Sequence, residues 1–287
     1  MQSEFLIGVD GGGTHCRTRL VAVDGTLLAE CKGGPANVYS DFDGALKRLN
    51  SLIENTFLSA GLPPAARQNT SAVLGLAGAN VPSVSARLRL SPFPFARVRL
   101  LSDVEIACIG AHAGEPGAVL IIGTGSQGVA WDGEHFHHIG GWGFTLADQG
   151  SGAILGQRLL RKSLQAHEGL IPGTALTERV MGHFSHTPDR LLSWSKGATP
   201  GDWGQFSPWA FEAAQAQDPL AEALIAENAS EIVVMAQALT RSSHGPLALM
   251  GGLAAPILPW LPHLIREQIV PAREDALSGA LQLARVW

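Results

Sequence analysis

The first apolar run of the chain ends in a carboxylate, three glycines and a hydroxyl, in the stretch Asp10-Gly-Gly-Gly-Thr14. Glycine lets the backbone take unusual conformations and come close to a ligand. Amide groups that converge in such a turn form an anion site, and phosphate is the usual occupant. Asp10 could then hold a metal ion against the phosphate. The alternative is a tight hairpin that needs glycine for its geometry alone.

The second half of the chain repeats this pattern. A strand expected over 118–122 leads into Gly123-Thr-Gly-Ser126, a second strand and the turn Asp132-Gly133, just as the first glycine turn leads to a strand and Asp24-Gly25. A third glycine pair, Gly251-Gly252, follows the last expected strand. The repetition favours phosphate binding over simple hairpins. It also predicts two α/β domains that face each other across a cleft.

Two carboxylates are candidates for chemistry. Asp103 follows a strand, and its neighbours Ser102 and Glu105 form a capping-box pattern. Because those two residues fill both capping roles, Asp103 is predicted to be catalytic, and the positive end of the helix is expected to keep it ionised. Asp148 lies in a glycine-rich loop where Ser151 is the nearer helix cap, so Asp148 is predicted to bind a ligand.

Other polar residues have plainer interpretations. Asn37 in a Gly-Pro loop could be a turn residue only. Trp142, taken alone, is more typical of packing than of recognition. His135, His137 and His138 are expected to be surface imidazoles on a hairpin arm rather than metal ligands, and Arg17 is expected to decorate a strand face.

Length and composition indicate the number of domains and the class of protein. The chain has 287 residues, which suits two domains, and a break at 114–117 divides it into 1–114 and 115–287. A net charge of −5 argues against general nucleic-acid or membrane binding. The three scattered cysteines form no disulfide framework, and the sequence shows neither a leader nor a membrane span, so a cytoplasmic protein is predicted. Helices are expected from Asp41, over 153–164, from Asp218 and over 275–286, with short helices over 171–210.

The order of the motifs resembles the BadF/BadG/BcrA/BcrD-type ATPase family, in the sugar-kinase, heat-shock-protein and actin superfamily, and its N-acetylglucosamine and glucosamine kinases most of all. The resemblance rests on Asp10-Gly-Gly-Gly-Thr14, Ala36-Asn37, Ser102-Asp103, Gly123-Thr-Gly-Ser126, Gly140-Gly-Trp142, Asp148-Gln-Gly-Ser-Gly152 and Met250-Gly-Gly252. It implies an α/β fold of two ribonuclease-H-like (actin-like ATPase) domains, with ATP and Mg²⁺ in the central cleft.

The resemblance also implies a role for each motif residue. ATP would be bound by Gly12, Gly13, Thr14, Thr124, Gly125, Gly251 and Gly252, the last two against the adenosine. Asp10 would position Mg²⁺, through water. The sugar would be held by Asn37, Asp103, Ser126, Gly141, Trp142 and Asp148, with Asp103 as the catalytic base.

The implied activity is transfer of the γ-phosphate of ATP to the 6-hydroxyl of N-acetylglucosamine, with glucosamine as the alternative substrate. N-acetylglucosamine is preferred because Trp142 would offer an apolar face to the acetyl methyl group. A non-kinase ATPase activator would need cysteines for an iron–sulfur cluster, and Cys108 stands alone in its helix. A sugar-sensing protein is the remaining alternative, and a homodimer is the default assembly.

Overall fold

The first sheet of the computed structural model, which describes residues 3–286, is built around the strand that precedes the first glycine turn. This strand is β1 (Phe5–Gly11). It pairs antiparallel with β2 (Cys16–Ala22), which in turn pairs antiparallel with β3 (Leu27–Gly33), while β4 (Thr70–Leu76) and β5 (Arg97–Leu101) run parallel to β1. The order is β3-β2-β1-β4-β5. Every residue of β4 is buried, as is typical of an inner parallel strand.

The second sheet repeats this arrangement with one strand fewer. Strands β6 (Gly117–Ile122), β7 (Ser126–Trp131) and β8 (Phe136–Gly140) form an antiparallel meander, and β9 (Leu247–Met250) pairs parallel with β6. The order is β8-β7-β6-β9. The predicted internal repeat, in which a strand leads into a glycine turn and two further strands follow, is therefore confirmed.

Amphipathic helices cover the outer face of the first sheet. Helix α1 (Phe42–Ser59) places Ala45, Leu49, Ile53 and Phe57 against β2 and β3 at helical spacing. The side chain of its N-cap residue, Asp41, accepts a hydrogen bond from the Gly44 amide in the first turn. Two short elements, η1 (Pro64–Asn69) and α2 (Pro82–Arg89), complete this face and were not predicted.

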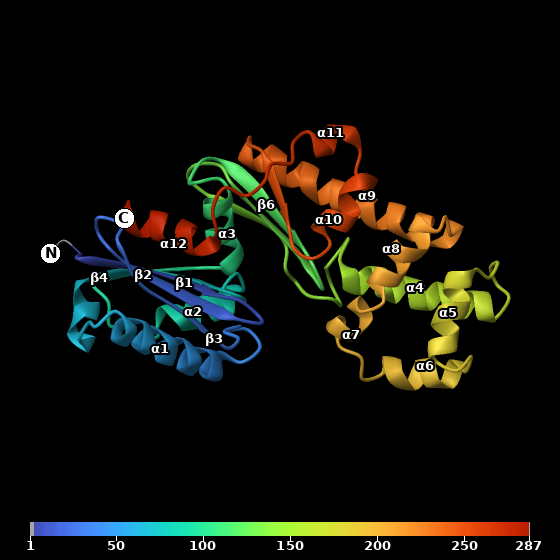
Figure 1. Ribbon diagram of the computed structural model, residues 1–287, viewed down its shortest axis with the longest axis horizontal. Coiled ribbons are helices and arrows are strands. Elements are labelled where there is room, and N and C mark those ends of the chain that lie inside the picture. Colours follow the sequence, from blue (N-terminus) through green and yellow to red (C-terminus); the bar gives the residue numbers. More distant parts are fainter. Residues whose placement is uncertain (1–2, 287) are drawn as a thin grey trace.

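Helix α3 (Asp103–Ala111) lies between the two sheets (Figure 1). Ile106 and Ile109 pack into the core beneath the first sheet, whereas Val104 and Cys108 pack against the second. The last helix, α12 (Ala276–Arg285), returns from the second half of the chain and packs against α3 and β1. The division at residue 114 stays a prediction, and we propose that α12 be counted with the first lobe.

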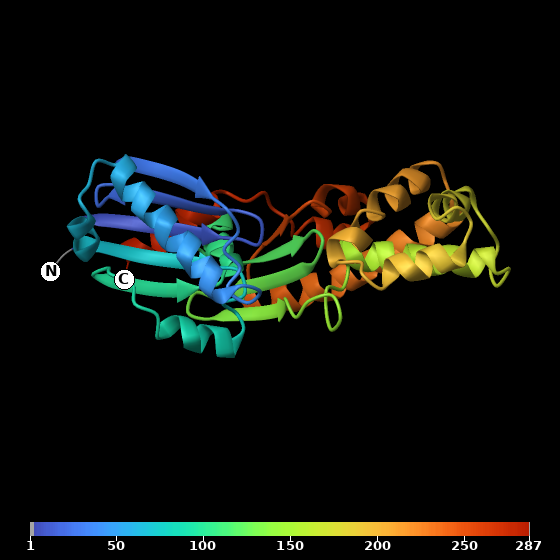
Figure 2. The ribbon, with the colours of Figure 1, turned by 90° about the horizontal axis from the view of Figure 1, so that it is seen from below.

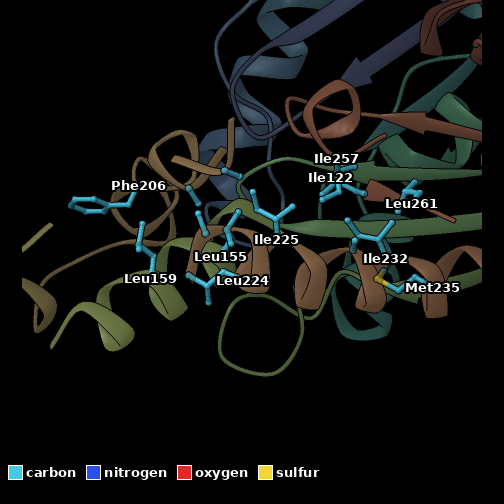
Figure 3. Close-up of a cluster of buried hydrophobic side chains, with 14 of the residues drawn as sticks. Ile122, Leu155, Leu159, Phe206, Leu224, Ile225, Ile232, Met235, Ile257 and Leu261 are labelled. Atoms are coloured by element: carbon cyan, nitrogen blue, oxygen red, sulfur yellow. The ribbon is translucent and has the colours of Figure 1, made fainter. Parts of the chain in front are cut away.

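The second lobe is completed by helices that extend away from the first lobe (Figure 2). A core of large aliphatic side chains joins the second sheet to its two longest helices, and Figure 3 shows Ile122, Leu155, Ile225 and Ile232 in it. The elements are α4 (Gly152–His167), α5 (Ala175–His183), α6 (Pro188–Ser195), α7 (Pro200–Gly204), α8 (Ser207–Gln215), α9 (Pro219–Ser243), α10 (Ala254–Ile257), η2 (Leu258–Trp260) and α11 (His263–Arg266).

The expected short helices of the 171–210 region are present as α5 to α7 and the start of α8. Among residues 3–286, no helix combines the length and the apolar character that a membrane crossing requires.

Candidate active site

The parallel strands β1, β4 and β5 end at the same edge of the first sheet, and both acidic candidates of the first lobe lie there. Asp10 of β1 is level with Gly75 of β4, which is level with Leu101 of β5, and Asp103 follows two residues later. The carboxyl ends of parallel strands are the usual ligand-binding edge of α/β sheets. The fold therefore brings Asp10 and Asp103 to one place.

A cavity of about 390 Å³ opens at this edge, between the two lobes. A smaller hollow adjoins it and shares Asp103, Gln127, Gly141 and Gly143 with it. The first lobe contributes Asn37, Tyr39, Ala77, Gly78, Asn80, Val81, Asp103 and Val104, and the second lobe contributes Ile121, Gly125, Ser126, Gln127, Gly141, Trp142, Gly143, Leu146 and Asp148. All six predicted sugar-site residues line one hollow or the other.

Asp103 is the first residue of α3, and the predicted capping box around it is present. The Ser102 hydroxyl accepts from the Glu105 amide at 3.3 Å, and Glu105 Oε2 accepts from the Ser102 amide at 2.6 Å. Asp103 Oδ1 accepts from the amide of Val104 at 3.0 Å. Asp103 is thus not needed as the cap, which leaves its carboxylate available to the cavity.

The electrostatics of Asp103 differ from the expectation. We expected the helix terminus to keep this carboxylate a weak base, but burial raises the pKa of Asp103 to about 6, and the negative charge of Asp10 adds to the rise. Desolvation penalises the charged form more than the helix dipole favours it. Asp103 is therefore a stronger base than the sequence indicated, and it is still largely ionised at neutral pH.

This pKa predicts the pH dependence of turnover. Because a general base must be deprotonated, kcat/KM for the sugar should fall as the pH drops below about 6, in proportion to the ionised fraction of Asp103. Initial rates at saturating Mg²⁺ and ATP, measured in half-unit steps of pH, test this expectation. A profile that stays flat to about pH 4.5 would contradict it, because that is the behaviour of an unperturbed carboxylate.

Unpaired amides mark the first glycine turn as an anion site. The Gly12 amide closes the turn on the His15 carbonyl at 2.9 Å, so Gly12 offers no donor. Among the described residues, the amides of Gly13 and Thr14 have no hydrogen-bond acceptor, and both residues are exposed. Backbone donors without a partner are suited to a phosphate.

The second and third turns lie side by side, since β6 and β9 pair in parallel up to Ile121 and Met250. The amides of Thr124, Gly125 and Gly252 likewise have no acceptor within residues 3–286. Gly251 differs from these three residues in its backbone conformation. Its φ is +93°, and a Cβ there would collide with the backbone of Ile122, so this glycine shapes the turn.

Arg17 contacts Asp10, whereas the sequence predicts only that it decorates a strand face. It lies opposite Asp10 in the β1–β2 ladder, and its Nη2 donates to Asp10 Oδ2 at 2.7 Å. Its Nη1 also lies 3.6 Å from Asp275, at the start of α12. The sequence could have predicted this pair, because two strands joined by a short turn place these residues opposite each other. Arg17 therefore holds the orientation of Asp10.

The predicted sugar-binding residues differ in whether their polar atoms already have hydrogen-bond partners within the protein. Asn37 Oδ1 accepts from the amides of Tyr39 and Ser40, which confirms the turn interpretation for this atom, while its amide nitrogen faces no acceptor in the described chain. The Ser126 hydroxyl donates to the Gln149 carbonyl at 2.7 Å. Trp142 is 59% exposed at the rim.

Asp148 is buried in a conformation that is rare for a side-chain-bearing residue. Its φ is +65°, in the left-handed region, and its Oδ1 accepts from the Ser126 amide at 3.2 Å. Burial raises the pKa of Asp148. Residues in sparsely populated backbone conformations cluster at functional sites, which agrees with the predicted ligand role.

The model of the BadF/BadG/BcrA/BcrD ATPase family matches residues 7–273. The chain belongs to this family. Glucosamine kinase GspK of Vibrio cholerae is 39% identical over 280 residues, with 98% of this chain and 95% of that protein covered. N-acetyl-D-glucosamine kinase of Dictyostelium discoideum is 28% identical, with 88% and 86% covered.

Solved structures agree with this membership of the BadF/BadG/BcrA/BcrD ATPase family. A Chromobacterium violaceum protein assigned as an N-acetylglucosamine kinase is 34% identical, with a TM-score of 0.84 and with 98% and 99% of the two chains covered. The ROK hexokinase of Thermus thermophilus, at 17% identity and a TM-score of 0.56 over 98% and 97%, shares the fold. The predicted family and the predicted two-domain actin-like fold are both confirmed.

Three polar side chains that line the cavity were not predicted, those of Tyr39, Asn80 and Gln127. Gln127 stands out because its Nε2 is buried without a hydrogen-bond partner. A buried donor of this kind is costly unless a ligand supplies an acceptor. In the sequence, only its position directly after the second glycine turn indicates that Gln127 could lie at the site.

Proposed function

We propose that this protein transfers the γ-phosphate of ATP to the 6-hydroxyl of an amino sugar bound between the lobes. Its relatives establish the class, an ATP-dependent sugar kinase, as the sequence predicted. The observation that carries the proposal is the placement of Asp103, whose carboxylate lines a cavity at the strand edge that also bears Asp10 and the first phosphate turn.

The triphosphate would lie on the unpaired amides of the two glycine turns. Gly13 and Thr14 would bind it from the first lobe, and Thr124 and Gly125 from the second, while Gly252 would face the adenosine. Gly12, whose amide is bonded to the His15 carbonyl, would shape its turn without donating, and Gly251 would shape the third turn beside the adenosine. Phosphoryl transfer asks a protein mainly for alignment and charge stabilisation, which backbone donors supply without rearrangement.

Asp10 fits a Mg²⁺ ion held partly by the nucleotide. Residues 3–286 contain no cluster of three or more acidic, histidine or cysteine side chains that could hold a metal by itself. Mg²⁺ usually keeps several waters and binds one or two carboxylates together with phosphates. A single carboxylate beside the first turn is that kind of partial site. When bound, the ion would neutralise phosphate charge, and Arg17 would keep Asp10 in place.

Asp103 would accept the proton of the sugar 6-hydroxyl and direct the oxygen at the γ-phosphorus. Its Oδ1 is already fixed by the Val104 amide, so Oδ2 is the atom that would face the hydroxyl. Asn37, Gln127 and Asp148 would hold the other hydroxyls of the sugar, since amides and carboxylates form directional hydrogen bonds.

Glucosamine is the amino sugar that the charges favour. Asp103 and Asp148 line the two hollows, and none of the described lining residues is a lysine, arginine or histidine. An anionic cleft attracts a protonated amine. The relative at 39% identity is a glucosamine kinase, which supports the same substrate. N-acetylglucosamine, which the sequence favoured, remains the second candidate because exposed Trp142 could contact an acetyl methyl group.

The test is a phosphorylation screen with ATP against glucosamine, N-acetylglucosamine, glucose and N-acetylmannosamine. The proposal expects glucosamine to give the highest kcat/KM, and a product that carries phosphate on the 6-oxygen by nuclear magnetic resonance. A preference for N-acetylglucosamine would reverse the choice of sugar but keep the kinase. Absence of turnover with all four sugars would refute the function.

Trp142→Ala separates the two substrates further. If Trp142 contacts the acetyl group, this change should lower kcat/KM for N-acetylglucosamine by about tenfold and leave glucosamine nearly unaffected, since one lost apolar contact is worth about 1–3 kcal/mol. Leu146→Ala, at a still more exposed position of the cavity lining, is the matched control. Equal losses for both sugars in Trp142→Ala would mean that the indole does not recognise the acetyl group.

The predicted homodimer and cytoplasmic location stay predictions.

A further inference from the structure

Two adjacent histidines of β8 have different partners. Side chains of neighbouring strand residues point to opposite faces of a sheet. The imidazole of His137 meets Asp132 of its own hairpin, at 2.8 Å between Nε2 and Oδ2. The imidazole of His138 meets Glu105 of α3, at 3.1 Å between Nε2 and Oε1. Both histidines are exposed, as expected of surface imidazoles, but His138 also reaches across to another element.

Glu105 is the residue that fixes the first turn of α3. Its Oε2 accepts from the amide of Ser102 at 2.6 Å and from the hydroxyl of Ser102 at 3.0 Å. Asp103 is the next residue of the chain. A continuous path of hydrogen bonds thus runs from His138 through Glu105 to the backbone that carries the candidate base.

The charges fix the direction of the His138 contact. Burial acts to raise the pKa of Glu105, but the hydrogen bonds from His138 and Ser102 outweigh it, so the pKa is lowered and the carboxylate is ionised. An ionised carboxylate only accepts, so His138 Nε2–H is the donor. Glu105 Oε1 has no other hydrogen-bond partner within the described residues, and only 14% of the Glu105 side chain is exposed.

The contact also joins two segments that lead to the cavity. His138 lies three residues before Gly141, in the middle of the strand that continues into the Trp142 loop. Glu105 lies two residues after Asp103. One hydrogen bond therefore connects the loop on the sugar side of the second lobe with the helix end that bears the base.

We propose that His138 is a positioning residue, which acts through Glu105 to hold Asp103 in line with the sugar loop. The inference rests on the proposed function, because the base is the group that is positioned. Reactions that depend on alignment lose about 10²-fold for a misplacement of roughly 1 Å, so a contact of this kind should affect kcat rather than nucleotide binding.

The test compares His138→Ala, His138→Gln and the matched control His137→Ala. His138→Ala should lower kcat for the preferred sugar about tenfold, with KM for ATP and the melting temperature unchanged. His138→Gln should recover most of the rate, because its amide can donate from nearly the same place. His137→Ala should behave like the unmodified protein. An unchanged kcat in His138→Ala would overturn the proposal.

A double-mutant cycle shows whether the effect passes through Glu105. If it does, His138→Ala should cost little more in a Glu105→Gln background, and the two losses will not multiply. Multiplied losses would mean that His138 acts by another route, which would also overturn the proposal.

Amide hydrogen exchange of the segment 101–109 tests the role of His138 without depending on the proposed kinase activity. Without any substrate, the segment should exchange faster in His138→Ala than in His137→Ala. Absence of sugar phosphorylation by the unmodified protein would refute the function, whereas equal exchange in the two variants would refute the structural role of His138.

Discussion

Asp103→Asn should lower kcat by about 10²–10⁴-fold, the usual cost of removing a positioned general base, while ATP affinity and the melting temperature stay nearly unchanged. The substitution keeps the oxygen that accepts from the Val104 amide. It also leaves the capping box of Ser102 and Glu105 intact. What it removes is the proton acceptor. Single-turnover kinetics with the preferred sugar, ATP titration by calorimetry and thermal melting measure the three quantities.

Asp41→Asn is the matched control for a purely structural carboxylate. Asp41 caps α1 by accepting from the Gly44 amide, and asparagine caps a helix about as well as aspartate. Its activity and stability should therefore be close to normal. If Asp103→Asn behaved in the same way, Asp103 would be a helix-end residue and the proposed mechanism would fail.

Elements with local signals could be predicted from the sequence. The Asp-Gly turns set both hairpins, and the Ser102–Glu105 pattern gave the start of α3 to the residue. Asp218 and Pro219 likewise marked the start of α9. These features depend on residues within about four positions of one another, so a linear reading finds them.

Contacts between distant segments could not be predicted in the same way. The pairing of Glu105 with His138 spans 33 residues, and that of Arg19 with Asp275 spans 256. The return of α12 to the first lobe depends on the close approach of α3, where a Cβ on Gly279 would collide with the Ile106 carbonyl. Nothing near Gly279 in the sequence indicates that neighbour.

The basicity of Asp103 shows how tertiary structure can reverse a local expectation. A helix N-terminus favours a charged carboxylate, and this part of the reasoning needed only the sequence. Desolvation depends on how segments distant in the sequence pack around the residue, and proximity to Asp10 depends on the sheet register. Both effects raise the pKa and outweigh the dipole.

Gly13→Val should lower kcat/KM for ATP by about 100-fold or more and leave the melting temperature unchanged. No protein atom lies within 4 Å of a Cβ built on Gly13, and its backbone is outside the left-handed region. The fold therefore tolerates the side chain. The added methyl groups would instead enter the space over the Gly13 and Thr14 amides, where the phosphates are proposed to bind, and displaced phosphates lose their alignment. Steady-state kinetics with varied ATP measures the loss.

Substitutions at two other glycines are expected to disturb the protein itself and not only the space for the ligand. Gly251→Ala should lower the melting temperature, because its φ is +93° and a Cβ would strike the Ile122 backbone. Gly125→Val would displace Asp148 as well as the phosphates, because the Asp148 carboxylate lies 3.0 Å from the added Cβ, so its loss of activity would have two causes. Gly13 is the position where only the ligand is obstructed. Normal affinity of Gly13→Val for ATP would place the phosphates elsewhere and remove the first turn from the nucleotide site.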